Sequence, residues 1–570
     1  HLGRGEERNQ RWLANVAVLT HLAMGLPTGA MSTGAAVNSP RLARLTSRRT
    51  SAGHAALALG ICSTGIYVIS AIISFWISSS QGVGREKLSF VLVGLLLPLT
   101  LVVLLRRRIE TQLGLLGVLL GVSAPIIGLV GMFRSGSDMG SVAAGLSLLI
   151  PLAGCGLVWA LTRRYLLLQA VLGGSLLVAA VITVLSGEHS AILGLAVGLA
   201  FGFGLFWRLR IAPPSRWLLL LDVSVITLFV LALGVYLALI LFPGQTGRLG
   251  AILPFYYEQR FASWRDTPAI INDYLFTGSG LGAAPMVLSS YLYMVHVPYY
   301  YHIHNLFLQV GIEQGMPGLI GITGMFIAAF WSMVTAMRRA HAYLALCAAS
   351  VFASLVSLFV SGLLESDIYA SVGVIFMFLP FGFAWVIALH DLSSAAARQR
   401  TPDRLRPLDL AVGALPLVLL VVLVAWPGSA TQWLANRAAL AQTRAELSEY
   451  VVDLTPSQDE QRRSGAVDLT EAVALYRQVL ASEPYNITAL RRLAQIQIAR
   501  GEYDAALLNL ERAWQVEPGE RATRQMLGEA YAVRGSLEQA TEVWRTVDNS
   551  ADQLLARLWW YAYAKEIDEA

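Results

Sequence analysis

The chain has 570 residues, of which 55% are hydrophobic and 14% are charged, and its formal net charge is +5. Soluble domains carry charge on about a quarter of their residues, so this composition excludes an ordinary soluble protein, and the long apolar runs indicate a polytopic membrane protein. The basic residues lie in short clusters between these runs, which argues against a nucleic-acid partner. The cysteines lie inside apolar runs without metal-ligand spacing, so neither a disulfide framework nor a metal is expected.

Residues 1–53 form a basic arm, with arginine clusters on both sides of the moderately apolar stretch Trp12–Met31. This stretch could be an interfacial helix, a disordered arm or an extra span. We favour the first two, because a span here would place one arginine cluster on the wrong side of the membrane.

Apolar runs between residues 54 and 426 predict an all-α membrane domain of about 11–12 spans. Arginine-rich loops alternate with loops that carry few basic residues, and the positive-inside rule makes the arginine-rich loops cytoplasmic. An odd number of spans then places the long 243–304 loop and everything after Trp426 on the outer face. The predicted spans are 54–78, 88–105, 111–133, 140–161, 165–185, 190–207, 217–242, 305–337, 341–363, 369–390 and 409–426.

A connector at 427–467 leads to a repeat region at 468–570, in which Ala472, Ala506 and Ala540 are spaced by 34 residues. Small residues at helix crossings with this period are typical of tetratricopeptide repeats, which stack into an α-solenoid. An unrelated helical bundle is the alternative. We expect the repeats to bind a protein partner.

The polar residues that could carry chemistry all lie on the predicted outer face. They gather in the short loop between the fifth and sixth spans, in the 243–304 loop and at the start of the next span. Guanidinium groups bind phosphate oxygens bidentately, and an imidazole can take a proton from a hydroxyl near neutral pH, so the set suits an anionic, sugar-bearing ligand. The candidates are Glu188, His189, Arg260, Trp264, Arg265, His302, His304, Asn305 and Glu313.

Each of these signals has a structural alternative. Arg260 and Arg265 could pair with neighbouring carboxylates at the loop surface, and Asn305 could serve only as a helix N-cap. The glycine-rich run 278–282 lies outside a strand–turn–helix context, so a plain turn is favoured over a nucleotide site. An interfacial aromatic belt, in preference to rings that stack on sugars, is predicted for Tyr291, Tyr293 and Tyr299–Tyr301.

The order of these elements resembles the O-antigen ligase family, which also includes bacterial polysaccharide polymerases and protein O-oligosaccharyltransferases. The resemblance runs from about Ser186 to Gly321 and includes an arginine shortly before Trp264, a Gly-x-Gly turn, and the element HNLFLQ followed by EQGMPG. It implies a glycosyltransferase-C-like membrane domain in the bacterial inner membrane. It also implies metal-independent transfer of a glycan from a polyprenyl diphosphate to an acceptor on the outer face, without a cofactor, in cell-envelope polysaccharide assembly.

The resemblance also implies residue roles: two arginines hold the diphosphate and a histidine activates the acceptor. By position, Arg260 is one diphosphate ligand and His304 is the base. Where the family has the other arginine this chain has His189, whose imidazole lacks the permanent charge and the fork of a guanidinium. Either Arg265 supplies the missing charge, or the donor differs, or catalysis has been lost. The alternative function is a non-catalytic membrane scaffold that recruits an envelope partner through its repeats.

A third class of function, a small-solute transporter, is disfavoured. Coupling and substrate sites at mid-membrane need charged residues, and the predicted spans hold almost none.

Overall fold

A computed structural model describes residues 40–104, 109–134, 139–211, 255–293, 303–370, 373–399, 407–449 and 458–545, with a few isolated positions beyond them. Within these ranges the chain is helical and has no strand. The predicted span at 217–242 and most of the N-terminal arm lie outside the described residues. The helices are α2 (Pro40–Ile77), α3 (Gln81–Leu104), α4 (Ile109–Arg134), α5 (Met139–Arg163), α6 (Leu166–Leu185), α7 (His189–Arg210), α10 (Phe255–Asp273), α11 (Ala284–Tyr293), α12 (Leu306–Arg339), α13 (Ala342–Leu364), α14 (Asp367–Ala370), α15 (Val374–Met377), α16 (Leu379–Gln399), α17 (Pro407–Gly413), α18 (Leu415–Ala425), α19 (Ser429–Leu447), α20 (Gln458–Ser464), α21 (Thr470–Ser482), α22 (Ile487–Ala499), α23 (Tyr503–Val516), α24 (Arg521–Val533) and α25 (Leu537–Trp544).

The described residues contain 8 helices long and apolar enough to cross a membrane, and all of them coincide with predicted spans. This confirms a multi-pass, all-α membrane protein. The predicted spans 88–105 and 409–426 are helical as well, within α3 and within α17 and α18, although these helices are not among the 8. Helices α18 and α19 meet the same criterion only as a pair, across a bend of 88°.

The chain divides into two compact units. The first unit comprises residues 1–66, 89–226 and 320–419, and the second comprises residues 67–88, 227–319 and 420–570. The second unit therefore joins the predicted outer loop and the start of α12 to the repeat region.

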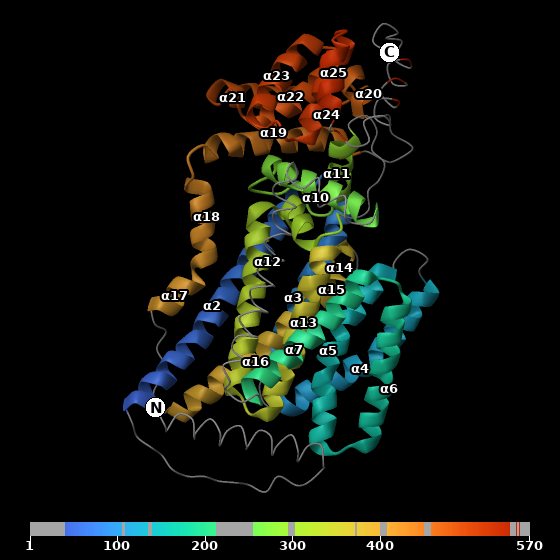
Figure 1. Ribbon diagram of the computed structural model, residues 1–570. Coiled ribbons are helices and arrows are strands. Elements are labelled where there is room, and N and C mark those ends of the chain that lie inside the picture. The colour runs from blue at the N-terminus through green and yellow to red at the C-terminus, as the bar shows by residue number, and fades with distance from the viewer. Residues whose placement is uncertain are drawn as a thin grey trace. The chain divides into compact units, whose positions relative to one another are not determined.

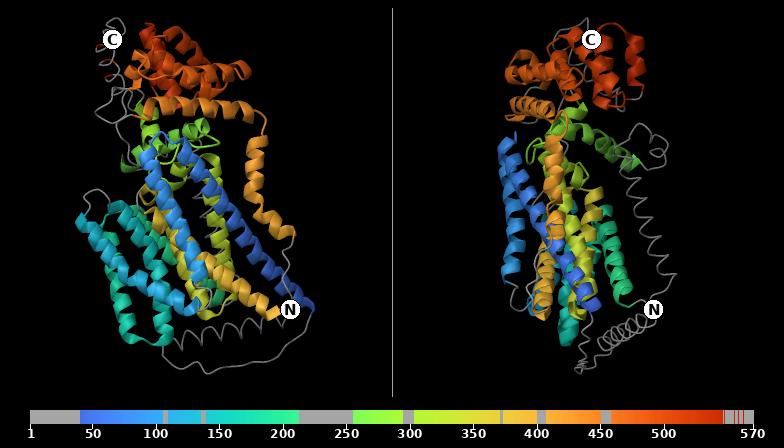
Figure 2. Two further views of the ribbon diagram at one scale, coloured as in Figure 1. Left: turned by 180° about the vertical axis from the view of Figure 1, so that it is seen from behind. Right: turned by 90° about the vertical axis from the view of Figure 1, so that its left-hand side faces the viewer.

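Within the first unit, α4, α5 and α6 lie side by side and α7 packs along α13 (Figures 1 and 2). Lipid gives little hydrophobic drive for helices to associate, so close packing of small residues replaces it. Gly194, Gly198 and Gly202 of α7 lie against Ala353 and Ser357 of α13, and a Cβ on any of these glycines would overlap the backbone of α13. These three glycines of α7 thus serve helix packing.

Within the second unit, α21 to α25 form the antiparallel helix pairs of a solenoid, drawn in orange to red in Figure 1. Ala472, Ala506 and Ala540 are all buried where the helices meet. Gly501 and Gly535 both adopt a φ of 77° after the helices that they follow, the left-handed conformation of a helix C-cap. The repeat architecture predicted from the spacing is confirmed.

Helix α19, predicted as part of a connector, extends this solenoid. Its residues Ala435 and Ala438 are buried in one apolar cluster with Leu469, Val473 and Tyr476 of the first repeat. Figure 2 shows α19 running along the repeat helices. The solenoid therefore begins before the first 34-residue repeat.

Candidate functional site

His304 lies in a strained turn at the start of α12. Its φ of 55° falls in the left-handed region, which is uncommon for a residue other than glycine. The next residue caps the helix, since the side-chain Oδ1 of Asn305 accepts a hydrogen bond of 3.0 Å from the N–H of Leu308. His304 thus directly precedes the N-cap at the positive end of the helix dipole. It is half-buried, and its neighbours Ile303 and Asn305 are both buried. Strain of this kind is concentrated at functional sites.

Trp264 fixes the position of this turn from α10. Its side chain is 2% exposed, and its indole Nε1 donates a hydrogen bond of 2.9 Å to the carbonyl oxygen of Ile303. Arg260 lies one helical turn earlier in α10; only its backbone belongs to the described part of the chain. The structure therefore brings Trp264 to the residue next to His304, and Arg260 precedes Trp264 by one turn of the same helix.

The glycine run 278–282 is a backbone connection to α12 and forms the turn that its sequence favoured. Gly278, Gly280 and Gly282 adopt φ values of 74°, 118° and 80°. The N–H of Ser279 donates to the carbonyl of Ile312 at 2.7 Å, and the N–H of Gly280 donates to the carbonyl of Glu313 at 3.2 Å. These bonds fall where α12 is broken and fix the end of its first part.

The break in α12 occurs at Gly315, whose φ of 66° and ψ of −166° are not helical. This region of backbone space is accessible essentially to glycine alone. A Cβ at Gly315 would also lie 2.8 Å from the carbonyl oxygen of Leu275, and the N–H of Met316 donates to that same oxygen at 2.9 Å. The EQGMPG motif thus encodes a kink that packs on the segment after α10.

Glu313 is fully buried beside this kink. Its Oε1 forms an ion pair of 2.8 Å with the Nζ of Lys87 and accepts a hydrogen bond of 3.3 Å from Gln309. Its backbone carbonyl also accepts a hydrogen bond of 2.5 Å from the hydroxyl of Ser74. Because a buried charge is costly without its partner, these contacts favour a role in bracing the kink over direct contact with a donor.

Arg265 and Asp266 form a partly buried pair on α10. The Nε of Arg265 lies 3.4 Å from Asp266 Oδ1, and the two side chains are 21% and 3% exposed. Burial raises the pKa of Asp266 above its ordinary value, although Arg265 and Arg521 partly offset that effect. Arg265 therefore forms the ion pair expected for it, but the pair does not lie at the loop surface, because the carboxylate of Asp266 is buried.

Glu188 and His189 belong to the first unit, whereas the other candidates belong to the second. Glu188 occupies the N-cap position of α7 without a side-chain capping bond. His189 is the first residue of that helix and is exposed, so its imidazole is accessible to a ligand.

Two further predictions concern the end of the long loop. His302 and the tyrosines at 299–301 lie outside the described residues. The prediction of an interfacial aromatic belt is wrong for Tyr291, which is 4% exposed and donates a hydrogen bond of 2.6 Å to the Oε1 of Glu520 in the repeats. A tyrosine hydroxyl taken out of water needs such a partner.

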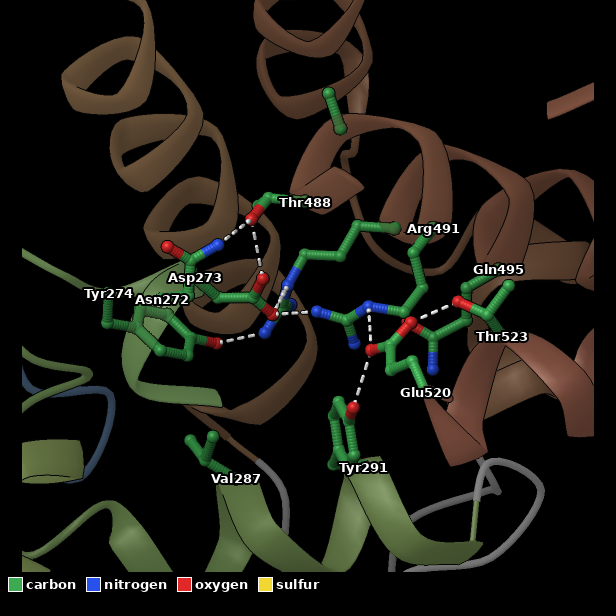
Figure 3. Close-up of polar contacts among 12 residues, drawn as sticks. Asn272, Asp273, Tyr274, Val287, Tyr291, Thr488, Arg491, Gln495, Glu520 and Thr523 are labelled. Atoms are coloured by element: carbon green, nitrogen blue, oxygen red, sulfur yellow. Dashed lines mark hydrogen bonds and ion pairs between the residues drawn. The ribbon is translucent and has the colours of Figure 1, made fainter. Parts of the chain in front are cut away.

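The structure also contains a polar network between α10 and the repeats that the sequence did not predict (Figure 3). Asp273, the last residue of α10, is 1% exposed, and its Oδ2 lies 2.5 Å from Arg491 Nη2 and 2.7 Å from Arg492 Nε. Its Oδ1 accepts a hydrogen bond of 2.8 Å from the hydroxyl of Thr488. The Nε of Arg491 also lies 2.9 Å from Glu520 Oε1. We call these residues, with Tyr291, the Asp273 network.

Electrostatics favours the ionised form of this network. Burial by itself would raise the pKa of Asp273, but attraction to Arg491 and Arg492 outweighs it and leaves the pKa below its ordinary value. Arg492 also donates a hydrogen bond of 2.6 Å to the hydroxyl of Tyr274. The one sequence signal for the network is the adjacent arginine pair in α22, whose other residues are uncharged, because buried charges require partners.

Within the described part of the chain, no group of three or more His, Cys, Asp or Glu residues is arranged to hold a metal ion.

Comparison with known families agrees with this description. A family model described as O-antigen ligase matches residues 174–323, and a model described as tetratricopeptide repeat matches residues 465–508 and 498–565. Comparisons with curated proteins and with solved structures give no match. An O-antigen ligase domain supports a role in glycan transfer of the ligase or polymerase type. The chain therefore carries an O-antigen ligase domain followed by tetratricopeptide repeats, as the resemblance predicted.

Proposed function

We propose that this protein transfers a glycan from a polyprenyl diphosphate carrier to an acceptor hydroxyl at the outer face of the bacterial inner membrane. The observation that carries the proposal is the arrangement around His304. An imidazole is held in a strained turn at a helix N-terminus, and that turn is bonded to the helix that bears Arg260.

In the proposed step, the acceptor oxygen attacks the anomeric carbon of the glycan as its proton passes to the imidazole of His304. The bond between that carbon and the diphosphate oxygen breaks, and its electron pair leaves with the polyprenyl diphosphate, so the anomeric configuration inverts. A positioned base of this kind contributes about 10²–10⁴-fold to rate. Arg260 stabilises the charge on the departing diphosphate, for which a guanidinium fork is suited.

The position of the second diphosphate-binding arginine distinguishes a glycan transferase from a non-catalytic scaffold. The exposed His189 stands where the resemblance expects arginine, which favours a non-catalytic scaffold unless Arg265 supplies the charge. Arg260 and Arg265 are five positions apart, so they do not share one face of a regular helix. For both to bind one diphosphate, either the backbone must bend or the Arg265 side chain must reach around the helix.

Binding of a short-chain polyprenyl diphosphate to the purified full chain tests this assignment. Arg260→Lys and Arg265→Lys should each weaken binding, because lysine keeps the charge but loses the bidentate geometry, and His189→Arg should preserve or strengthen it. Arg534→Lys, at an exposed arginine of the repeats, is the matched control. If both lysine variants bind like the control and the wild type transfers no glycan, the scaffold is the better account.

A further inference from the structure

We propose that the repeat domain positions the transfer site through α10, with Asp273 as the positioning residue. This inference rests on the proposed function, because it explains how His304 is held for that reaction. It also gives the repeats a role within the chain, beyond binding a partner protein. All the residues that carry it belong to the second unit.

Helix α10 is attached at two separate points. Trp264 bonds the carbonyl of Ile303, next to His304, and Asp273 bonds Arg491 and Arg492 in repeat helix α22. Nine residues separate the two attachments, about 14 Å along a helix. A helix held in this way transmits the position of the repeats to the His304 turn.

The chain that leaves Asp273 makes a second connection to the same element. It runs through Tyr274 into the glycine turn, where Ser279 and Gly280 donate hydrogen bonds to the carbonyls of Ile312 and Glu313. The first part of α12 is therefore held at its beginning by Trp264 and at its end by the glycine turn. Asp273 lies between Trp264 and the glycine turn along the chain, so its attachment to the repeats can fix the position of both.

The second outer helix supports the same attachment. Tyr291 of α11 donates to Glu520, which forms an ion pair with Arg491, and the guanidinium of Arg491 lies 4.7 Å above the Tyr291 ring. Figure 3 shows Tyr291 and Asp273 approaching Arg491 from different helices. One arginine of the repeats therefore holds α10 and α11 together.

The arginines of this network do not form a site for the donor diphosphate. Arg491 and Arg492 are matched by the carboxylates of Asp273 and Glu520. A small cavity of about 10 Å³ adjoins them, which is the size that one water molecule fills. The further arginine that lines it, Arg462, pairs with Glu446 and Asp459. Because these arginines are already paired with carboxylates and the cavity is small, the network attaches the helices to one another and is unsuited to binding an anion.

Hydrogen exchange of the full chain in lipid nanodiscs, read by mass spectrometry, tests the inference together with transfer kinetics. We expect Asp273→Asn to raise amide exchange in α10 and in residues 303–309. We also expect it to lower kcat by roughly ten- to a hundredfold, since small displacements at a reacting centre have effects of this size, while KM for the lipid-linked glycan stays within about twofold. Asp273→Glu, which keeps the carboxylate, should restore part of the rate.

Two further variants keep the test informative if Asp273→Asn does not fold. Tyr291→Phe removes only the hydroxyl that bonds Glu520 and should give a smaller change of the same kind. Arg534→Met removes an exposed ion pair with Asp504 elsewhere in the repeats and should change neither readout.

The outcomes separate the two proposals. If the wild type transfers no glycan but Asp273→Asn raises exchange at 303–309, the proposed function is wrong and the attachment through Asp273 stands. If the wild type transfers glycan, and the Asp273→Asn and Tyr291→Phe variants leave exchange at 303–309 and kcat unchanged, the positioning role is wrong.

Discussion

The indole nitrogen of Trp264 lies 2.9 Å from the carbonyl oxygen of Ile303, so α10 is bonded to the residue immediately before His304. In the family resemblance this tryptophan accompanies the diphosphate-binding arginine. The structure gives it a separate physical role, which is to hold the backbone of the His304 turn.

Trp264→Phe should therefore impair catalysis more than binding. The phenyl ring retains part of the packing but leaves the buried Ile303 carbonyl without its donor, and an unpaired buried group costs about 1–3 kcal/mol. We expect kcat for glycan transfer to fall about tenfold, as one such bond allows, with normal membrane insertion. Trp426→Phe, at a residue that is 67% exposed, is the control. Equal rates in the two variants would show that the bond does not position His304.

The kink of α12 should be intolerant of any side chain at Gly315. Gly315→Ala meets both an unfavourable backbone conformation, which costs about 1–3 kcal/mol, and overlap with the carbonyl of Leu275. Gly428→Ala is the matched control, because Gly428 has a φ of 88° but no atom within 4 Å of an added Cβ. Thermal melts in detergent should show the larger loss of Tm for Gly315→Ala. A loss no larger than that of the control would mean that the packing at the kink is not tight.

The two buried carboxylates of α10 should respond to pH with opposite sign. The folded-state pKa of Asp266 is raised, so its contribution to stability is greatest below the ordinary aspartate pKa of about 3.9 and falls as the pH rises through the folded-state pKa. Asp266→Asn should therefore raise Tm at pH 7, and the gain should vanish as the pH approaches 4. A constant gain across this range would contradict the raised pKa.

The folded-state pKa of Asp273 is lowered, so its stabilisation is present above the ordinary aspartate pKa and is lost as the pH falls through the folded-state pKa. Asp273→Asn should accordingly lower Tm at neutral pH, and the difference from wild type should shrink in strong acid. The exposed variant Asp504→Asn serves as the control for both carboxylates.

Features set by local sequence periodicity were predictable. The spans follow from apolar runs of membrane length, the solenoid from the spacing of Ala472, Ala506 and Ala540, and the cap at Asn305 from the residue type at a helix start. The left-handed glycines of the 278–282 turn also agree with the plain turn that was favoured.

Features set by contacts between distant segments were not predictable. The local pattern of a run of tyrosines near a membrane predicts an aromatic belt for Tyr291, but its partner Glu520 lies 229 positions away. Lys87 and Glu313 form a buried pair across 226 positions. No periodic pattern connects such residues, and a single sequence contains no record of their proximity.

The orientation of the repeats remains a prediction from the charge alternation of the loops. Single cysteines at Ser457 and Ser550, in a chain whose native cysteines are replaced, should react with a membrane-impermeant maleimide in intact cells. This is expected because an odd number of spans follows a cytoplasmic arginine cluster. Reaction only from the cytoplasmic side would reverse the topology and remove the outer-face site with it.

The central claim is that His304 is the base of a glycan transfer, and its most direct test is a transfer assay in proteoliposomes with lipid-linked glycan and an acceptor. The wild type should transfer glycan, and His304→Ala should reduce the rate by about 10²–10⁴-fold while the protein stays inserted and still binds the donor. His341→Ala, at a half-exposed histidine of the first unit, should keep the wild-type rate. Transfer by His304→Ala at the wild-type rate would contradict the account.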